Sequence, residues 1–379
     1  MARLTARGWL LVALSVLYAA VVIPVGIHKG IDVEIHIKVA QGLLAGHPVY
    51  SEAPSIGVWW PPFAILALTP FALLANLSMP LAKGAFAVLG VACVAWSIAR
   101  FGREGRPYLA LAVAAVAVPL QINFDYLNIN AVLLALVVAA GFDLAQSRDV
   151  RAGVWLGLAA ALKAFPAVLL LYVAYRRRWR AAATGVSLAL GVSVCALLSS
   201  GVSGALTSAQ VWLANSRTGG WVLHPRNQSL FALLSRAGVP HEAAIAVDLL
   251  LLALAAVALR RSTSHDVVQD VGIVILLAVL VSPIGWDHYY LLAFPAWVAA
   301  LSRAPASWTR SARISLLAAG IATSGLLTVG SATLRGVLRE HSMFAWGGLV
   351  LVVVLLVERL RAPASQAALQ PLEQGAHGR

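Results

Sequence analysis

The feature that most constrains this chain is a series of long apolar runs with few charged residues, which recur along its whole length. A helix of about 20 apolar residues crosses a hydrocarbon core of about 30 Å. A membrane barrel would instead show short alternating segments. The sequence therefore predicts an all-α polytopic membrane protein. Its apolar runs cover residues 8–28, 60–77, 80–99, 108–120, 127–145, 152–175, 181–198, 241–259, 267–281, 288–301, 314–329 and 343–357.

The charge balance supports this class. Only 11% of the residues are charged and the net charge is +13, whereas a soluble domain carries about 25% charged residues. The basic residues lie dispersed at the ends of the runs, which is typical of cytoplasmic loops and not of a nucleic-acid-binding domain. Both cysteines, Cys93 and Cys195, lie inside apolar runs, so no disulfide framework is expected.

Arginine placement predicts the orientation. Arg3 and Arg7 precede the first run, so we expect a cytoplasmic N-terminus and an extracytoplasmic segment 29–59. Counting every run as a full crossing places the arginines of 148–151 outside. A half-depth hairpin over 152–175, broken at 163–166 by Lys163-Ala-Phe-Pro166, would keep them inside. We therefore expect 10–13 transmembrane or half-crossing helices.

We expect one transmembrane domain over residues 1–360, with outer loops at 29–59 and 199–228. The polar tail 361–379 is predicted to be disordered. No internal repeat of the kind found in transporters is visible in the sequence.

The first outer loop carries the most suggestive acids. Asp32 and Glu34 follow the first run directly, ahead of an expected interfacial helix over 33–44. A carboxylate there can act as general base for a hydroxyl at the bilayer surface. The alternative is a pair of solvated loop acids, and two carboxylates alone are a weak metal signal. Glu52 is a third acid of this loop, and Trp59 and Trp60 fit an aromatic belt.

Other polar side chains interrupt the apolar runs. Lys163 either snorkels to an interface or meets an anion such as a lipid phosphate, since a buried ammonium costs about 2.5–3.5 kcal/mol. Asp248 lies within an apolar run and is a candidate functional residue. The alternative is that water or a neighbouring polar group reaches it, because it is close to the end of that run. A polar knot between two runs is either a plain turn or a sugar-binding edge. It consists of Gln121, Asn123, Asp125, Asn128 and Asn130.

Two further clusters lie on the expected outer side. Arg226 and His288, placed outside against the charge rule, call for an anionic partner such as a lipid phosphate. Tyr289 and Tyr290 fit an aromatic belt better than a site. The neighbours of these residues are His224, Asn227, Gln228, Trp286 and Asp287.

The ordered set of these segments resembles the integral-membrane glycosyltransferases of the GT-C type, and within them glycosyltransferase family 87. That family is typified by bacterial polyprenol-phosphate-mannose-dependent α-mannosyltransferases. The chain shows no P-loop and no dinucleotide-binding glycine pattern, so a sugar donor would have to arrive in the membrane. The resemblance rests on Asp32, Pro70 and residues 42–50, 60–63, 121–123, 153–166, 177–180, 227–230 and 282–288.

The resemblance implies the inverting transfer of a hexosyl group from a polyprenyl-phosphate sugar to a lipid-linked or polysaccharide acceptor. The hexosyl group is expected to be mannosyl. The expected place is the extracytoplasmic face of the bacterial plasma membrane, with membrane lipids as partners and no nucleic acid, required metal or other cofactor. Asp32 is the expected general base, with Glu34 next, and His288 is expected near the donor phosphate. His36 and Tyr289 stand where the family often has Tyr and His, so mannose is not assured.

The remaining site residues fall into two expected groups. Donor phosphate or sugar binding is assigned to His288, Arg226, Asn227, Gln228, Lys163, Trp286 and Asp287. Acceptor or sugar binding is assigned to His36, Tyr50, Trp60, Gln121, Asn123 and Asp125. The alternative function is a lipid or solute transporter or flippase, which would use Asp248, Lys163 and Asp125 as an ion path. Asp32 and His288 in one outward-facing cavity would favour the enzyme, whereas polar residues that line a mid-membrane path would favour the transporter.

Overall fold

The computed structural model describes residues 6–50, 60–102, 108–217, 221–260, 267–302 and 308–361. Predictions for Arg3, Glu52, Trp59 and the tail from 362 lie outside these ranges. Within them the chain is helical and contains no β-strand, with one isolated bridge between Asn227 and Trp286. The all-α prediction is confirmed.

The helices follow one another with short connections. The first half of the chain contains α1 (Ala6–Lys29), α2 (Ile31–Leu44), α3 (Pro62–Ala67), α4 (Thr69–Leu77), α5 (Met79–Gly102), α6 (Leu109–Ala114), α7 (Ala117–Tyr126), α8 (Asn130–Ala145), α9 (Asp149–Leu162), η1 (Phe165–Ala167) and α10 (Val168–Tyr175). The second half contains α11 (Trp179–Leu198), α12 (Gly201–Arg217), α13 (Leu230–Arg236), α14 (His241–Arg260), α15 (Val267–Val281), η4 (Asp287–Ala293), α16 (Phe294–Leu301), α17 (Arg310–Ser324), η6 (Leu326–Thr328), α18 (Ala332–Glu340) and α19 (Met343–Arg361).

Five of these helices are long and apolar enough to cross a membrane: α1 from Trp9, α5, α11, α14 and α19. Three shorter apolar helices are α8, the Phe165–Tyr175 segment and α15. The chain is therefore a polytopic membrane protein, while the number of complete crossings stays a prediction. Several expected runs are broken in two. The run 60–77, for example, divides into α3 and α4 at Leu68.

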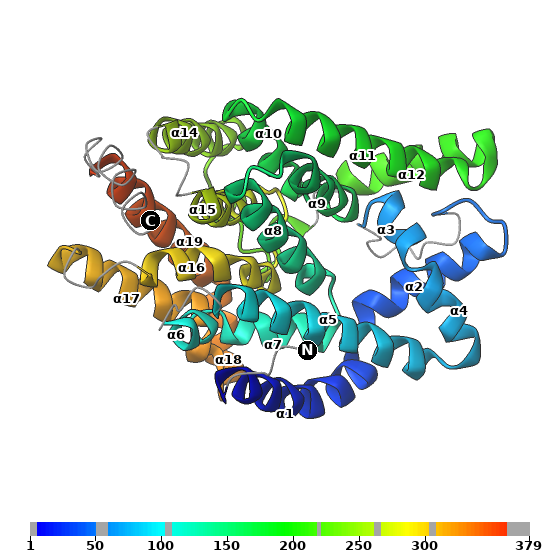
Figure 1. Cartoon of the computed structure of the whole chain (residues 1–379), viewed down its shortest axis with the longest axis horizontal. Helices are drawn as coiled ribbons and strands as arrows, with labels where there is room; N and C mark the ends of the chain where they lie inside the picture. The colour runs from blue at the N-terminus through cyan, green and yellow to red at the C-terminus, as the bar shows by residue number, and fades with distance from the viewer. Residues whose placement is uncertain are drawn as a thin grey trace, which may run out of the picture.

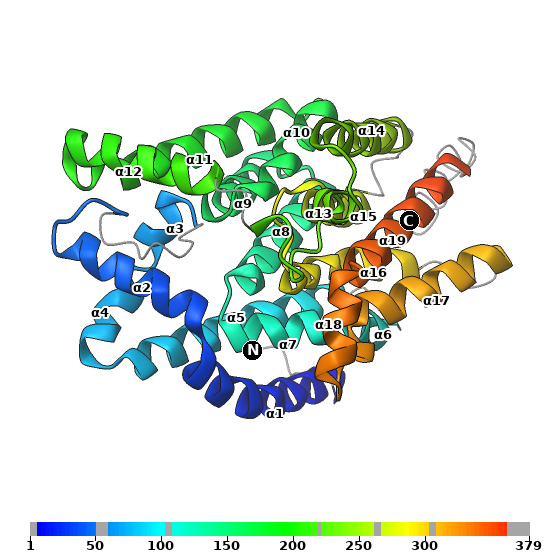
Figure 2. The same cartoon turned by 180° about the vertical axis from the view of Figure 1, so that it is seen from behind.

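Both expected outer loops contain helices. The helix expected over 33–44 is present as α2, and it begins earlier than predicted, so Asp32 lies in the first turn of a helix and not in a loop. Most of the segment 199–228 forms α12. In Figures 1 and 2, α2, α3, α4 and α12 gather at one end of the long axis of the molecule, and α14, α17 and α19 lie toward the other.

The hairpin predicted over 152–175 is present. Lys163 is extended (φ −155°, ψ 136°) between α9 and the turn η1, so the chain reverses there. Arg178, just beyond α10, donates to Leu144 O at 2.9 Å and to Asp149 Oδ1 at 2.8 Å, next to the start of α9. The two ends of the hairpin thus lie together, and Lys163 is at its tip.

The first arm of this hairpin, α9, packs closely against α11. A Cβ at Gly153 would lie 2.5 Å from the carbonyl oxygen of Ala181, and one at Gly157 would lie 2.6 Å from that of Gly185. Small residues allow such close approach of two backbones. Both views show α9 beside α11 (Figures 1 and 2).

Arginines from both halves of the chain meet at the open end of the hairpin. Arg148 and Arg151 approach Asp143 at 3.7 and 3.4 Å, and Arg176 donates to Leu259 O at 2.8 Å. Further members of this network are Arg100 over the Phe142 ring, Arg178 with Asp149, and Arg359 with Asp270. The hairpin thereby brings 148–151 to the same end as the other basic clusters.

Candidate active site

The site begins at the junction of α1 and α2, which packs against the turn between α7 and α8. A Cβ at Gly30 would lie 2.5 Å from both Gly26 O and Leu127 Cδ1, so a larger residue would push the two turns apart. Leu127 itself adopts a left-handed conformation (φ +51°) that ends α7. Residues held in such strained conformations often lie at functional sites. The close approach sets Asp32 beside Asn128.

Asp32 belongs to a chain of hydrogen bonds that ends on the buried side chain of Lys163. Asn128 Nδ2 donates to Asp32 Oδ2 at 2.8 Å. Lys163 Nζ donates to Asn128 Oδ1 at 3.0 Å and to Asn130 Oδ1 at 3.1 Å, and lies 3.7 Å from the centre of the Tyr289 ring. Lys163 is buried, so it does not snorkel. The Asn128 amide thus connects the Lys163 side chain at the hairpin tip with the carboxylate of Asp32.

Glu34 has different partners from Asp32. It forms ion pairs with Lys38 at 2.8 Å and with Lys83 at 3.0 Å. The hydrogen bond from Lys38, together with the contact to Lys83, lowers the pKa of Glu34 despite partial burial. The two acids singled out in the sequence are therefore not equivalent, and only Asp32 joins the Lys163 cluster.

An aromatic group covers the next turn of α2. The rings of His36 and Trp60 stack with centroids 4.0 Å apart and an interplanar angle of 19°, and Tyr50 donates to Trp60 O at 2.8 Å. His36 Nδ1 lies 2.6 Å from the carbonyl oxygen of Asp32. Burial lowers the pKa of His36 to about 4. The structure thus brings His36, Tyr50 and Trp60 together next to Asp32.

A second cluster surrounds the fully buried carboxylate of Asp287. Arg226 Nη2 lies 3.0 Å from Oδ1 and Arg339 Nη2 lies 2.6 Å from Oδ2. Burial raises the pKa of Asp287, but the hydrogen bond with His288 and the two guanidinium charges outweigh it and hold the pKa well below its usual range. Arg226 also donates to the hydroxyl of Tyr126. Two arginines thus share one carboxylate, which leaves a positive excess.

His288 and Tyr289 join the two clusters. Asn130, which binds Lys163, also donates to His288 O at 3.4 Å, and the Tyr289 ring contacts Lys163. Asp287 Oδ1 lies 3.4 Å from His288 Nδ1. Asp32 and His288 therefore belong to one constellation, linked through Asn128, Lys163 and Asn130.

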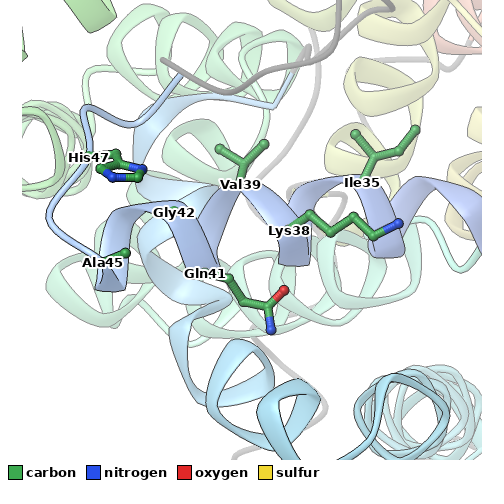
Figure 3. A pocket seen from close by; sticks show the side chains of 7 residues that line it. All are labelled: Ile35, Lys38, Val39, Gln41, Gly42, Ala45 and His47. Atoms are coloured by element: carbon green, nitrogen blue, oxygen red, sulfur yellow. The ribbon is translucent and has the colours of Figure 1, made fainter.

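A pocket of about 670 Å³ runs along one face of α2 (Figure 3). Two polar side chains of its lining bond to residues outside it: Lys38 pairs with Glu34, and Gln41 donates to Asn76 at 2.7 Å. The pocket is lined by Ile35, Lys38, Val39, Gln41, Gly42, Ala45 and His47.

Comparison with known proteins decides the family. The model of glycosyltransferase family 87 matches residues 59–283, more than half of the chain. The chain belongs to glycosyltransferase family 87. It is therefore a glycosyltransferase, as predicted.

Curated relatives carry related names. A "polyprenol-phosphate-mannose-dependent alpha-(1-2)-phosphatidylinositol mannoside mannosyltransferase" of Mycobacterium tuberculosis is 30% identical over 70% of this chain and 69% of its own. A protein of the same name from Mycolicibacterium smegmatis is 28% identical over 92% and 90%. A pentamannoside mannosyltransferase of M. tuberculosis is 28% identical over 86% and 79%. None of these names suggests a transporter. No solved structure matches the chain.

The family match of 59–283 includes Lys163, Arg226, Asn227 and Gln228 but neither Asp32 nor His288. Within the match, two amides of this family 87 enzyme hold the backbone. Asn227 Nδ2 donates to Pro283 O at 2.9 Å and its Oδ1 accepts from Gly285 N at 2.8 Å. Gln228 donates to Pro225 O and Arg339 O and accepts from Phe344 N. The Gln228 side chain thereby ties the segment between α12 and α13 to α18 and α19.

Four predicted residues lie beside the constellation and bond elsewhere. Asp125 accepts from Gln121 at 2.9 Å and pairs with Lys29 at 3.3 Å, so both face α1. The backbone of Asn123 accepts from Asn128 N at 2.9 Å and supports the turn after α7. Trp286 packs its ring against Trp221 and His224.

Two predictions about single residues are wrong. Tyr289 and Tyr290 are buried and do not form an aromatic belt, and Tyr290 donates to Gln228 O at 2.7 Å.

Arg339 was missed, although arginines in a short segment between two apolar runs on the expected outer side gave a signal. Asn128 and Tyr126 offered no such signal, because their roles depend on partners distant in the sequence.

No three side chains of His, Cys, Asp or Glu come close enough to hold a metal ion in the part of the chain that the structure describes. The potential ligands of the constellation are instead paired with cations: Asp287 with two arginines, and Asp32 with Lys163 through Asn128.

Proposed function

We propose that this family 87 enzyme transfers a mannosyl group from polyprenyl-phosphate mannose to a mannose-bearing, lipid-linked acceptor, with inversion. The observation that carries the proposal is the meeting of one carboxylate, Asp32, with a buried ammonium and a cationic cluster. The names of the relatives, which state dependence on polyprenol-phosphate mannose, support the choice of donor.

The donor phosphate belongs with the positive excess. Arg226 and Arg339 share the single carboxylate of Asp287, so an anion nearby relieves the repulsion between them. Guanidinium groups bind phosphate oxygens in a fork geometry. Lys163 adds a further charge at the hairpin tip. These groups stabilise the negative charge that grows on the leaving phosphate.

Asp32 takes the proton of the acceptor hydroxyl. Its Oδ2 accepts from Asn128, which orients the carboxylate and leaves Oδ1 for the substrate. As the proton moves to Asp32, the acceptor oxygen bonds to the anomeric carbon. The bond from that carbon to the phosphate oxygen breaks, and polyprenyl phosphate leaves with the electron pair. A single displacement from the opposite face inverts the anomeric centre.

The charge distribution favours an extracytoplasmic site. The arginine network lies at the open end of the α9–α10 hairpin and Lys163 lies at its tip, so the two are at opposite ends of α9. By the positive-inside rule the network is cytoplasmic. Ile27 at the end of α1 packs against Gly84 near the start of α5, so these helices run antiparallel. The N-terminus is then cytoplasmic and the site faces outward.

The test is sugar transfer by the purified protein in lipid nanodiscs. Polyprenyl-phosphate mannose, glucose and galactose are offered with a phosphatidylinositol mannoside as acceptor. We expect consumption of the mannose donor alone and a product with the opposite anomeric configuration. Use of a nucleotide sugar in place of the lipid donor, or retention of configuration, would contradict the proposal.

A further inference from the structure

The ring of His36 is buried, and two contacts fix its orientation. It follows Asp32 by one turn of α2 and is 4% exposed. Its ring is fixed on one side by the stack on Trp60 and on one edge by the contact of Nδ1 with Asp32 O at 2.6 Å. These two contacts determine both the position and the orientation of the remaining ring nitrogen, Nε2.

The contact at Nδ1 also determines the tautomer. A backbone carbonyl only accepts, so Nδ1 carries the proton and donates. The lowered pKa, about 4, keeps the ring neutral above pH 5. Nε2 is therefore unprotonated and can only accept a hydrogen bond. It is buried and has no hydrogen-bond partner within the residues that the structure describes.

An unpaired buried acceptor destabilises the protein, unless a ligand supplies the missing donor. That ligand group must carry a proton. The oxygens of an ionised phosphate do not, whereas a sugar hydroxyl does. Nε2 thus fits a hydroxyl and not the phosphate of the donor.

The spacing to Asp32 narrows the choice of hydroxyl. Side chains four residues apart on a helix begin about 5–6 Å from each other. Hydrogen bonds from hydroxyl groups are about 2.7–2.8 Å long. Two hydroxyls on neighbouring ring carbons have the right span to reach both side chains at once.

We propose that His36 Nε2 accepts a hydrogen bond from the acceptor-sugar hydroxyl next to the one that Asp32 deprotonates, so that the enzyme selects acceptors with a vicinal diol. This inference rests on the proposed function. It makes His36 a residue that determines acceptor specificity, in contact with the substrate and without transferring the proton itself.

The first test reads the ring directly by ¹⁵N NMR of histidine-labelled protein in nanodiscs. His341 is a built-in control, because its Nδ1 makes the same contact with the carbonyl four residues before it, Val337 O at 2.8 Å, on an exposed ring. We expect an unprotonated Nε2 at His36 from pH 5.5 to 8. Octyl α-D-mannopyranoside should shift the His36 Nε2 signal upfield and leave that of His341 in place.

A protonated Nε2 at His36 would overturn the proposal, as would no shift at saturating mannoside. A shift with methyl β-D-mannosyl phosphate but not with the octyl mannoside would assign the hydroxyl to the donor and overturn the choice of acceptor. Because this arm needs no turnover, it decides on His36 even if sugar transfer, and with it the proposed function, fails.

The second test uses turnover with octyl mannoside and its monodeoxy analogues. His36→Gln keeps an acceptor atom near Nε2, and His36→Phe keeps a stacking ring without one. Loss of the neighbouring hydroxyl should lower kcat/KM of the wild type at least about tenfold and that of His36→Phe hardly at all. The glutamine variant should resemble the wild type. Equal penalties in wild type and His36→Phe would refute the contact.

Discussion

Replacing Asp287 by Asn tests whether the buried charge cluster is organised as described. Asp287 is fully buried at the start of η4. Its Oδ1 accepts from Arg226 Nη2 at 3.0 Å and from the backbone N–H of His288 at 2.9 Å, and its Oδ2 accepts from Arg226 Nε at 3.3 Å. Arg339 contributes the shortest ion pair at 2.6 Å.

The substitution keeps the shape and removes the charge. The two guanidinium groups then face each other without a counter-charge, and the new amide directs N–H donors at one of them. Breaking a buried ion pair by removing one partner costs about 3–5 kcal/mol. At about 2 °C per kcal/mol for a chain of this size, Tm should fall by roughly 6–10 °C.

The assay is thermal unfolding in nanodiscs, followed by intrinsic tryptophan fluorescence. Asp125→Asn is the matched control, because it also removes one carboxylate from an ion pair. Its partner Lys29 has a side chain 57% exposed, and pairs of that kind contribute about 0–1 kcal/mol. We expect the control to shift Tm by less than about 2 °C.

Equal shifts in the two variants would refute the argument, because burial would then not distinguish the two ion pairs. A second comparison sharpens the result. Arg339→Gln combined with Asp287→Asn removes one of the two opposed cations, so the double variant should be more stable than Asp287→Asn alone. If it is less stable, the two guanidinium groups do not repel each other as the geometry requires.

Three further predictions follow from the same contacts. Lys163→Met should lower kcat/KM by roughly 10²–10³, since preorganised charge is worth about that much. Activity within threefold of wild type would exclude Lys163 from the site. Gln228→Leu leaves two carbonyls and one N–H unpaired at about 1–3 kcal/mol each, so it should lower Tm far more than Gln121→Leu, and an equal effect would contradict the clamp. The depressed pKa of Asp287 means that its stabilisation is complete above the unfolded value of about 3.9 and is lost only as pH falls through the lower folded pKa. The Tm difference between wild type and Asp287→Asn should therefore be constant from pH 8 to 5 and shrink below about pH 4, and a change between pH 5 and 8 would point to another group.

The membrane class and the hairpin were predictable because their signals are local. An apolar run is visible within about 20 residues, and Pro166 in the segment 163–166 predicts a kink or an end of the helix. The conflict between the arginines of 148–151 and the charge rule pointed to the hairpin. The observed contact of Arg178 with Asp149 confirms it.

The constellation itself was only partly predictable. Asp32, Lys163, Arg226 and His288 stand out because charged or titratable groups near apolar runs demand an explanation. Asn128, which connects Asp32 with Lys163, is an ordinary turn residue in the sequence, and its partners lie 96 and 35 positions away. Pairing over such distances depends on the packing of several helices, and no local pattern records it.

The division of α6 from α7, and the helix α12 within an expected loop, have the same origin. Helix ends in this chain often lack side-chain caps, as at α7 and α8. Contacts with neighbouring helices therefore set the boundaries more than local sequence does. Tyr289 was misplaced for a related reason, since a tyrosine near a run end fits both a belt and a site. Its buried contact with Lys163 decides between the two.

The most direct test of the central claim is single-turnover mannosyl transfer by wild type, Asp32→Asn and Glu34→Gln from polyprenyl-phosphate mannose. The two acids lie in the same turn of α2, but only Asp32 joins Asn128 and Lys163. We predict that Asp32→Asn loses at least about a hundredfold, as removal of a general base requires, and that Glu34→Gln stays within about tenfold of wild type. An active Asp32→Asn beside an inactive Glu34→Gln would contradict the assignment of the base.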